Sequence, residues 1–347
     1  MRILLPTLYG NLGGSTRVLL AAAEALRAEH EVHVRAPRPE ADSRTGPSLP
    51  GDAIDTLGRK LAAMPRLGWC VLREVAFLRR LRPDLIHVHD EIALYVWGTA
   101  GRIAGIPVLW HVHMREGVGR TRALRDRLSS AKLFISRHSV GEGQTKPHAV
   151  IRNPVTPPAL ALHPTDGRLR LAVIGTLSDR KNQALAVETI AALAARGRPA
   201  SLDLYGESLD RRIGDRLQAL ATEHGVARQV RRHGHTPLGD ALAATDVLLA
   251  PSTYENQPLI VLEALAAGIP VVASDIPAHR EIAALLNTPA LTLCPADAGA
   301  FADAAAAARP DPTVVKTVAR AFGPQRFGLE LRDFVASLAT KGIVAPR

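Results

Sequence analysis

The chain of 347 residues contains few cysteines and aromatic side chains. Its two cysteines, Cys70 and Cys294, lie far apart and have no spacing typical of a metal or redox motif. A disulfide framework is therefore not expected, and a reducing cytoplasm fits this composition. Aromatic residues make up only 4%. Neither a zinc-finger spacing nor an aromatic RNA-recognition pattern is present, so we expect no nucleic-acid partner.

Long uninterrupted apolar runs are also lacking. The longest apolar stretch, 258–273, contains Glu263 and a Gly-Ile-Pro break, which argues against a transmembrane span. The first residues, MRILLPTLYG, are interrupted too soon by proline and glycine to form a signal peptide. We therefore expect a soluble protein. Hydrophobic residues make up 47% of the chain, enough to bury sizeable cores, and its length suggests two domains.

The net charge of +10 is unevenly distributed. Residues 1–160 carry 23 Lys and Arg against 14 Asp and Glu, whereas residues 161–347 carry 20 against 19. A basic half of this kind is typical of proteins that meet nucleic acid, an anionic membrane or a phosphorylated substrate. Solvated arginines without a specific partner are the alternative.

Short β-rich runs alternate with longer helical stretches rich in Ala, Leu and Arg, which predicts an α/β protein with parallel sheets. Strands are expected at 2–6, 31–36, 84–89, 108–113, 132–135, 149–151, 170–175, 201–205, 230–233, 247–250, 271–273 and 290–293. Helices are expected notably at 15–28, 60–81, 92–104, 182–195, 211–223, 258–267, 298–308 and 325–340.

A proline-rich stretch without periodicity, NPVTPPALALHPTDGR, separates the two halves of this pattern. We expect a first domain over 1–155, a second over 165–322, and a C-terminal helix within about 325–347 that packs back on the first. Doubly wound sheets bind ligands outside the carboxyl ends of their strands.

The strongest local signal is YENQPLIVLEALAAGIPVVAS, in which Glu255 and Glu263 lie eight residues apart around Pro258. A helix that begins near Pro258 would present free N–H groups suited to a diphosphate. A carboxylate beside it could accept two neighbouring sugar hydroxyls. On spacing alone, a capped helix with two solvated glutamates is an equal alternative.

The block PSTYENQPLIVLEALAAGIPVVASDIPAHREI resembles the E-x7-E signature of the family 4 retaining glycosyltransferases. That family has the GT-B fold, two Rossmann-like, doubly wound parallel-sheet domains that face a cleft. Further segments in family order extend the resemblance over most of the chain: LGGSTRV, RPDLIHVHD, GIPVLWHVH, VIRNPV, IGTLSDRKNQ, LYGES and GHTPLGDALAATDVLLAPS.

The resemblance implies a role for individual residues. Glu263 would hold the ribose hydroxyls of the donor nucleotide, and Glu255 would contact the transferred sugar. Lys181 would neutralise the leaving diphosphate. Gly13 and Gly14 match the glycine loop that lets the backbone approach the donor phosphates and the acceptor.

His113 matches the family histidine that points into the cleft near the donor sugar. It belongs to one of two His-Val-His segments, His87/His89 and His111/His113, each of which places two imidazoles on one strand face. A zinc site built from these pairs is an alternative. No acidic or cysteine ligand is spaced to complete it, so we assign no metal ligands.

Two departures from the family pattern affect the donor site. Thr176 stands where the family has a basic residue, and Arg180 would supply the missing charge. The usual Glu-Gly-Phe-Gly run reads Glu255-Asn256-Gln257-Pro258, so Asn256, Pro258 and Leu259 would form altered walls of the donor pocket.

The resemblance implies a retaining hexosyltransferase that uses a UDP- or GDP-sugar and a glycan or lipid-linked acceptor, in cell-surface polysaccharide or glycoconjugate biosynthesis. No Asp-x-Asp motif is present. The leaving-group charge would then be met by Lys181, Arg180 and the helix at Pro258, and no cofactor or metal is expected. Front-face attack is the favoured mechanism, with double displacement through Glu255 as the alternative.

Two rival functions use the same fold: epimerisation or hydrolysis of a nucleotide sugar, and non-catalytic nucleotide-sugar binding. The presence of Glu255, Glu263, Lys181 and His113 argues against the second. Arginines interleaved with apolar residues at 73–82 and 115–127 also suggest a cytoplasmic protein that lies peripherally on the inner face of an anionic membrane. The alternative is that these apolar residues pack into the core.

Overall fold

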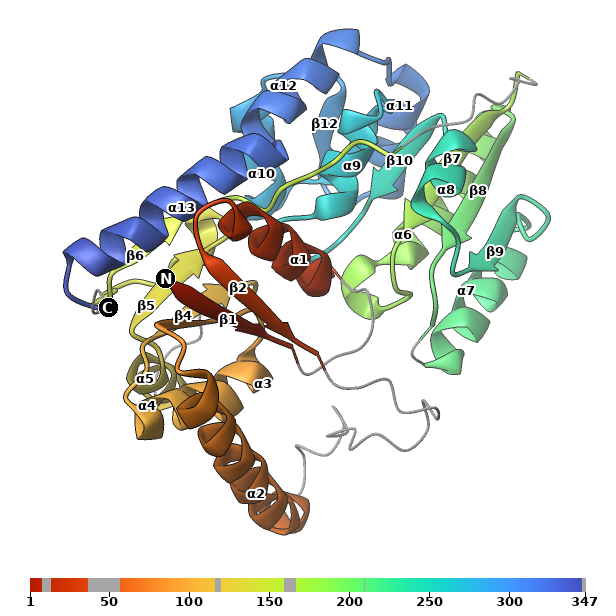
Figure 1. Cartoon of the computed structure of the whole chain (residues 1–347). Helices are drawn as coiled ribbons and strands as arrows, with labels where there is room; N and C mark the ends of the chain where they lie inside the picture. The colour runs from red at the N-terminus through yellow and green to blue at the C-terminus, as the bar shows by residue number, and fades with distance from the viewer. Residues whose placement is uncertain (8–13, 37–56, 116–119, 159–166, 209, 345–347) are drawn as a thin grey trace. The chain divides into compact units, whose positions relative to one another are not determined.

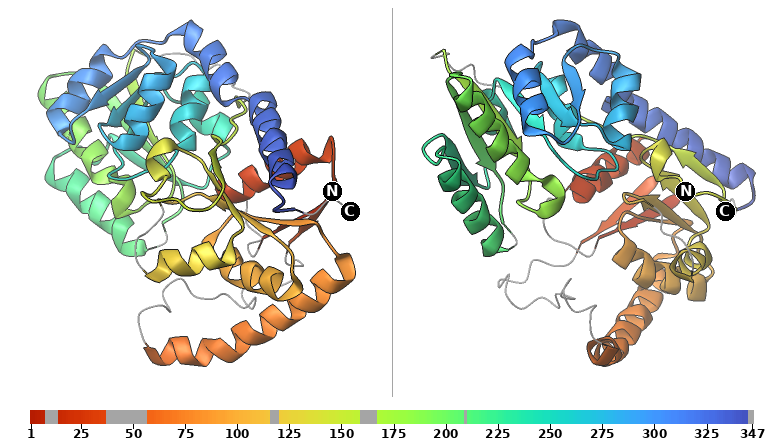
Figure 2. Two further views of the ribbon diagram at one scale, coloured as in Figure 1. Left: turned by 90° about the vertical axis from the view of Figure 1, so that its left-hand side faces the viewer. Right: turned by 180° about the vertical axis from the view of Figure 1, so that it is seen from behind.

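The computed structural model describes residues 1–7, 14–36, 57–115, 120–158, 167–208 and 210–344. The chain divides into two compact units, Met1–Asn153 with Phe327–Arg347, and Pro154–Arg326. Figures 1 and 2 show the elements of each unit. Among the helices described, none is long and apolar enough to cross a membrane.

The first unit contains a six-stranded parallel sheet in the order β2-β1-β3-β4-β5-β6. Its strands are β1 Arg2–Pro6, β2 Glu31–Arg35, β3 Leu85–Val88, β4 Val108–Val112, β5 Ala131–Phe134 and β6 His148–Val150. The chain moves outward from β1 to β2 and then returns to place β3 on the other side of β1. This reversal creates a switch point at the carboxyl ends of β1 and β3.

Helices cover both faces of the first sheet (Figures 1 and 2). On one face lie α1 Gly14–Arg27 and α13 Pro324–Thr340, tied together because Arg332 contacts Glu29 at 2.9 Å. The other face carries α2 Leu57–Leu81, α3 Glu91–Ala93, the π-helical turn η2 Leu94–Gly98, α4 Thr99–Ala104 and α5 Arg120–Leu128, and a 3-10 turn η3 spans Arg137–Ser139. The core on that second face is built from Ile86, Val88, Trp110 and Val112 of the strands against Val75, Leu78 and Trp97.

The second unit contains a parallel sheet in the order β12-β11-β10-β7-β8-β9. Its strands are β7 Leu169–Ile174, β8 Ala200–Tyr205, β9 Val230–Gly234, β10 Val247–Ala250, β11 Val271–Ser274 and β12 Leu291–Cys294. Counted within the unit, this is the Rossmann order, with its switch point between β7 and β10.

Two apolar cores cover the faces of the second sheet. Side chains of α6 Gln183–Ala195, α7 Arg211–Glu223 and α11 Ala298–Ala307 pack in one core. Side chains of α8 Leu238–Ala243, α9 Leu259–Ala266, α10 Pro277–Leu286 and α12 Pro312–Phe322 pack in the other. A short 3-10 turn, η4 Asp179–Lys181, precedes α6. Strands buried on both faces explain the nearly continuous apolar runs of the sequence.

The expectation of two doubly wound parallel sheets is confirmed, and each expected strand differs from the observed one by at most one residue at either end. One helix expectation was wrong: the single helix over 92–104 is interrupted by the π-helical turn η2. A Cβ atom on Gly98 would meet Leu128 Cβ at 2.9 Å. The wider turn accommodates this close approach, as π-bulges do within α-helices.

A glycine after β8 has no tolerable substitute. Gly206 has φ +137°, and a Cβ atom there would lie 2.2 Å from the carbonyl oxygen of Gly175. Gly197 also has positive φ, +65°, but a Cβ atom there would meet no atom within 4 Å. We expect Gly206→Ala to lower the free energy of unfolding by more than about 3 kcal/mol, because backbone strain and overlap add.

The matched variant Gly197→Ala carries only the left-handed strain and should cost about 1 kcal/mol. Urea denaturation followed by far-ultraviolet circular dichroism measures both. Equal losses in the two variants would show that the approach of Gly206 to Gly175 is not tight.

Candidate active site

The loop after β7 carries the basic residues of the site. Gly175 directly follows the strand with φ +141°. A Cβ atom there would lie 3.5 Å from Lys181 Cε, so the lysine side chain passes directly over this glycine. Ser178 caps η4, since its hydroxyl accepts from the Lys181 backbone N–H at 3.3 Å. The cap fixes the turn that places Arg180 and Lys181 side by side.

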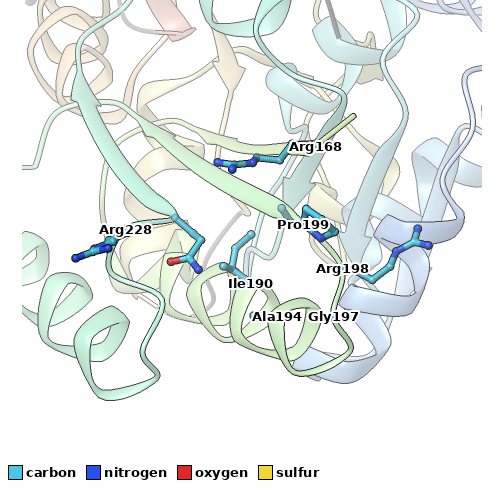
Figure 3. A pocket seen from close by; sticks show the side chains of 9 residues that line it. Arg168, Ile190, Ala194, Gly197, Arg198, Pro199 and Arg228 are labelled. Atoms are coloured by element: carbon cyan, nitrogen blue, oxygen red, sulfur yellow. The ribbon is translucent and has the colours of Figure 1, made fainter. Parts of the chain in front are cut away.

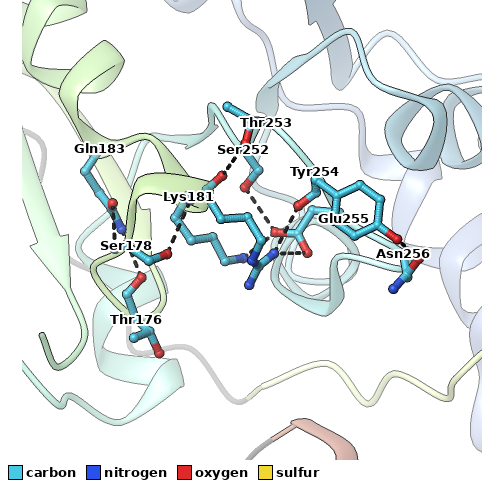
Figure 4. A network of polar contacts seen from close by, with 10 residues as sticks. Thr176, Ser178, Lys181, Gln183, Ser252, Thr253, Tyr254, Glu255 and Asn256 are labelled. Atoms are coloured by element: carbon cyan, nitrogen blue, oxygen red, sulfur yellow. Dashed lines mark hydrogen bonds and ion pairs between the residues drawn. The ribbon is translucent and has the colours of Figure 1, made fainter. Parts of the chain in front are cut away.

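The loop after β10 supplies the carboxylate. Glu255 Oε1 lies 2.7 Å from Lys181 Nζ, and Glu255 Oε2 lies 2.8 Å from Arg180. Ser252 Oγ donates to Glu255 Oε1 at 3.0 Å. The Glu255 side chain is only 10% exposed. Figure 4 shows these groups converging from the two loops.

Backbone hydrogen bonds join the same two loops. The carbonyl oxygen of Arg180 accepts from the Thr253 N–H at 2.9 Å, and the Arg180 guanidinium donates to the Tyr254 carbonyl at 3.0 Å. Because β7 and β10 are neighbouring parallel strands, their following loops meet at one edge of the sheet. The cluster of Lys181, Arg180 and Glu255 therefore lies at the switch point of the second unit.

The cluster sets the ionisation of its carboxylate. Burial alone would raise the pKa of Glu255, but the charges of Lys181 and Arg180 and the hydrogen bonds of Lys181 and Ser252 outweigh it and hold that pKa below its ordinary value. Glu255 is therefore an anion at neutral pH, held by two cations. One positive charge remains in excess beside it.

The helix that follows brings the second glutamate. Pro258 is the N-cap of α9 and makes no side-chain cap bond, so the helix begins at Leu259, one position later than expected from the sequence. Glu263 is the fifth residue of α9 and is 6% exposed, between the buried Leu262 and Ala264. A carboxylate buried among apolar neighbours costs free energy unless polar groups meet it.

The pocket walls named from the sequence lie in the same loop. Asn256 is half-buried and accepts a hydrogen bond from the Tyr254 hydroxyl at 2.7 Å. Pro258 is buried and Leu259 is half-buried. Thr176, by contrast, is exposed, and its carbonyl oxygen accepts from Gln183 at 3.2 Å. Arg180 therefore supplies the second basic side chain beside Lys181, and Thr176 does not.

One residue of this neighbourhood was missed by the sequence analysis. His279, in the first turn of α10, is fully buried and its Nδ1 contacts the Ser274 carbonyl at 2.7 Å. Burial lowers its pKa, while the charges of Glu255 and Lys181 act on it in opposite directions. The only signal was its position within the block PSTYENQPLIVLEALAAGIPVVASDIPAHREI, where nothing distinguished it from a packed helix residue.

In the first unit, the four histidines of the two His-Val-His segments stack at the carboxyl ends of β3 and β4. Ring centroids lie 4.3 Å apart for His87 and His89, 4.6 Å for His89 and His111, and 4.4 Å for His111 and His113. His113 is half-buried, and its Nε2 lies 3.4 Å from His89 Nδ1.

The stacked rings are uncharged at neutral pH. Burial, with the charge of His113, lowers the pKa of His87 to about 3, and burial lowers the pKa of His113 to about 4. Burial also lowers the pKa values of His89 and His111 well below the ordinary range. The structure thus gathers His113 with three further rings.

Gly14 is exposed and opens α1, and Gly13 lies outside the described residues.

A pocket at the opposite edge of the second sheet lacks this chemistry (Figure 3). It lies where β8 begins and is lined by Arg168, Arg198 and Arg228 beside the end of α6, without a carboxylate. Doubly wound sheets bind ligands at the carboxyl ends of their strands, so we place the candidate site at the Glu255 cluster.

Comparison with known proteins agrees with this geometry. The family model described as "Glycosyltransferase Family 4" matches residues 12–151, and that described as "Glycosyl transferases group 1" matches residues 168–309. Together the two models cover most of the chain. The second includes Lys181, Glu255 and Glu263.

Two curated relatives come from Mycobacterium tuberculosis. A glycogen synthase is 27% identical over 72% of this chain, and the match spans 66% of that enzyme, just under two thirds of its length. A GDP-mannose-dependent alpha-(1-6)-phosphatidylinositol dimannoside mannosyltransferase is 27% identical over 85% of this chain and 82% of its own length.

Among solved structures, Anabaena HepE in complex with UDP and glucose superposes with a TM-score of 0.74. It shares 20% identity, over 97% of this chain and all of the other. At that identity the likeness shows the fold, which is GT-B. Taken with the two family models, these observations place the chain in family 4 of the glycosyltransferases, the group 1 glycosyl transferases.

Proposed function

We propose that the protein is a retaining glycosyltransferase that moves a hexose from a UDP- or GDP-sugar to a glycan or lipid-linked acceptor. The observation that carries this proposal is the cluster of Lys181, Arg180 and Glu255 at the switch point of the second unit. Two cations and one carboxylate beside a helix N-terminus suit a diphosphate joined to a polyhydroxylated ring. The mannosyltransferase and glycogen synthase relatives support this class of chemistry.

In the proposed reaction, Lys181 and Arg180 bind the diphosphate of the donor. Their excess positive charge stabilises the negative charge that grows on the leaving group as the glycosidic bond breaks. This arrangement needs no divalent cation at the diphosphate. Glu255 accepts hydroxyl groups of the transferred hexose, and Glu263 accepts the ribose hydroxyls. Gly14, at the start of α1, would allow close approach of the acceptor.

The ion pairs of Glu255 favour front-face attack over double displacement. A carboxylate held by Lys181 and Arg180, with a lowered pKa, is a weak nucleophile. In front-face attack, the acceptor oxygen bonds to the anomeric carbon on the side from which the diphosphate leaves. Its proton passes to a phosphate oxygen. His113 is the residue of the first unit to which we assign a catalytic role.

Product analysis distinguishes transfer from the rival reactions. Incubation with UDP- and GDP-hexoses, with and without oligosaccharide or lipid-linked acceptors, should release nucleoside diphosphate only in step with a new glycoside. Nuclear magnetic resonance should show the anomeric configuration of the donor retained. Change of the donor without any acceptor would identify an epimerase or a hydrolase.

The assignment of Glu263 is tested by Glu263→Gln. Glutamine keeps the shape but weakens bonds to the ribose that are each worth about 1.5–3 kcal/mol. We expect the donor KM to rise by about 10-fold or more with the fold intact by circular dichroism. Glu223→Gln, on the exposed surface of α7, is the matched control and should leave KM unchanged. Unchanged donor kinetics in Glu263→Gln would remove the residue from the nucleotide site.

The phosphate role is tested by Lys181→Ala and Arg180→Ala. Each should lower kcat by at least about 100-fold, because leaving-group charge grows in the transition state. Arg216→Ala removes only an exposed ion pair with Asp179 on η4, so it should keep the wild-type kcat. If Arg180→Ala keeps wild-type activity while Lys181→Ala is inactive, Arg180 is a surface residue. It then does not replace the basic residue that the family has at the position of Thr176.

We also propose that α2 carries the protein onto an anionic membrane on the cytoplasmic side. Its outward face combines Trp69 and Leu72, 64% and 66% exposed, with the exposed Arg79 and Arg80, while the exposed Arg73 pairs with Glu74 at 2.6 Å. Val71, Val75 and Leu78 pack inward, so only part of the apolar content enters the core. An amphipathic face of this composition binds acidic headgroups, each basic residue contributing about 1 kcal/mol.

The second arginine-rich segment contributes less than the sequence suggested. Arg125 in α5 is committed to Glu91, and Arg122 pairs with Asp126 and contacts the Glu142 carbonyl. Among the larger side chains of α5, Leu124 and Arg127 are exposed. The membrane proposal therefore rests on α2.

Vesicle sedimentation tests this proposal. The wild-type protein should pellet with vesicles containing anionic lipid, remain in the supernatant with neutral lipid, and dissociate as salt approaches about 0.5 M. Arg79→Glu with Arg80→Glu should abolish binding. The same charge change at Arg198 and Arg228, two exposed arginines of the second unit, should not. No binding at low salt would favour an acceptor in solution.

A further inference from the structure

Three histidines of the stack in the first unit, His87, His89 and His111, have no part in the proposed sugar transfer. His87 and His89 lie on one face of β3 and its continuation, and His111 and His113 on the same face of β4 and its continuation, because side chains alternate along a strand. The intervening Val88, Trp110 and Val112 pack in the core on the opposite face. Parallel pairing sets Val88 beside Trp110, which carries His89 alongside His111.

The rings nearest the interior have no hydrogen-bond partners among the described residues. Both nitrogens of His87 and of His111, and Nε2 of His89, are buried without one. His87 and His111 are 0% exposed, and His89 is 2% exposed. Buried polar groups in folded proteins are nearly always satisfied, and each exception requires an explanation. Five unpartnered nitrogens in one stack are far more than packing alone accounts for.

Their spacing approaches that of a coordination sphere. One ligand nitrogen from each of His87, His89 and His111 can be chosen so that all three lie within 4.8 Å of one another. Ligands around a tetrahedral ion with Zn–N bonds of 2.0–2.1 Å lie roughly 3.3 Å apart. Binding an ion therefore requires the side chains to rotate until their nitrogens lie closer together.

We propose that His87, His89 and His111 bind one divalent transition-metal ion of the zinc class, with a fourth position open to water. His89 binds through Nε2, because its Nδ1 faces His113 Nε2 at 3.4 Å. With its proton on Nδ1, His89 donates to His113, the usual way in which a partner orients a metal-bound histidine. The ion joins β3 to β4 at the carboxyl edge of the sheet.

The ligand chemistry selects the ion. Three imidazoles suit Zn²⁺, Co²⁺, Ni²⁺ or Cu²⁺, whereas Mg²⁺ and Ca²⁺ need carboxylate and carbonyl oxygens, and the group contains no carboxylate. The sequence alone offered no acidic or cysteine ligand spaced to complete such a site. A third imidazole from the neighbouring strand takes that place.

Metal titration of the full chain tests the proposal. Protein freed of metal by a chelator should bind one equivalent of Zn²⁺ by calorimetry, and Zn²⁺ should raise its thermal midpoint by stabilising the native state. Co²⁺ should give the visible absorption bands of a low-symmetry nitrogen site. His87→Leu and His111→Leu should each weaken Zn²⁺ binding by at least about 100-fold. His148→Ala, an exposed histidine of the same unit, should bind as the wild type does.

Two results would overturn the site: Zn²⁺ binding equally well in the leucine variants, or wild-type binding that is weak and exceeds one equivalent. Should both leucine variants fail to fold, X-ray absorption of the Zn²⁺-loaded wild type decides. Scattering from three imidazoles is expected, and a shell without imidazole contradicts the proposal. None of these readouts depends on glycosyl transfer, so the proposed function stands or falls separately.

Discussion

The ion pairs between Glu255 and the two basic residues Lys181 and Arg180 are the contact on which the candidate site depends. They join the loop after β7 to the loop after β10, and Thr253 adds a backbone bond to the same junction. Lys181 and Glu255 are only 15% and 10% exposed, so removing one partner of their pair leaves charge uncompensated, at a cost of about 3–5 kcal/mol. The pairs therefore hold the two loops together and position the groups of the candidate site.

Sheet topology decides where such clusters form. Both sheets are parallel and reverse their order once, between β1 and β3 in the first unit and between β7 and β10 in the second. The loops on either side of a reversal run in opposite directions and leave room for polar side chains. The Glu255 cluster lies at one such edge and the histidine stack adjoins the other, which explains why polar residues of both units gather after strands.

The fold could be predicted from the sequence because buried parallel strands give short apolar runs between helices. The π-helical turn at Leu94–Gly98 could not, because it depends on how closely Gly98 approaches Leu128. Within the site, the spacing of Glu255 and Glu263 and the charge of Arg180 were readable in the sequence. The burial of His279 and the meeting of histidines from two strands were not, because they arise from packing between segments distant in sequence.

The central claim, that Lys181 and Arg180 bind a donor diphosphate beside Glu255, is tested most directly by calorimetric titration with nucleotides of each base. The account predicts that either UDP or GDP binds at least about tenfold more tightly than its own monophosphate, since charge-assisted bonds to one phosphate exceed about 1.4 kcal/mol. That advantage should disappear in Lys181→Ala. If the wild-type protein binds the diphosphate and the monophosphate with equal affinity, the claim that Lys181 and Arg180 bind a donor diphosphate is contradicted.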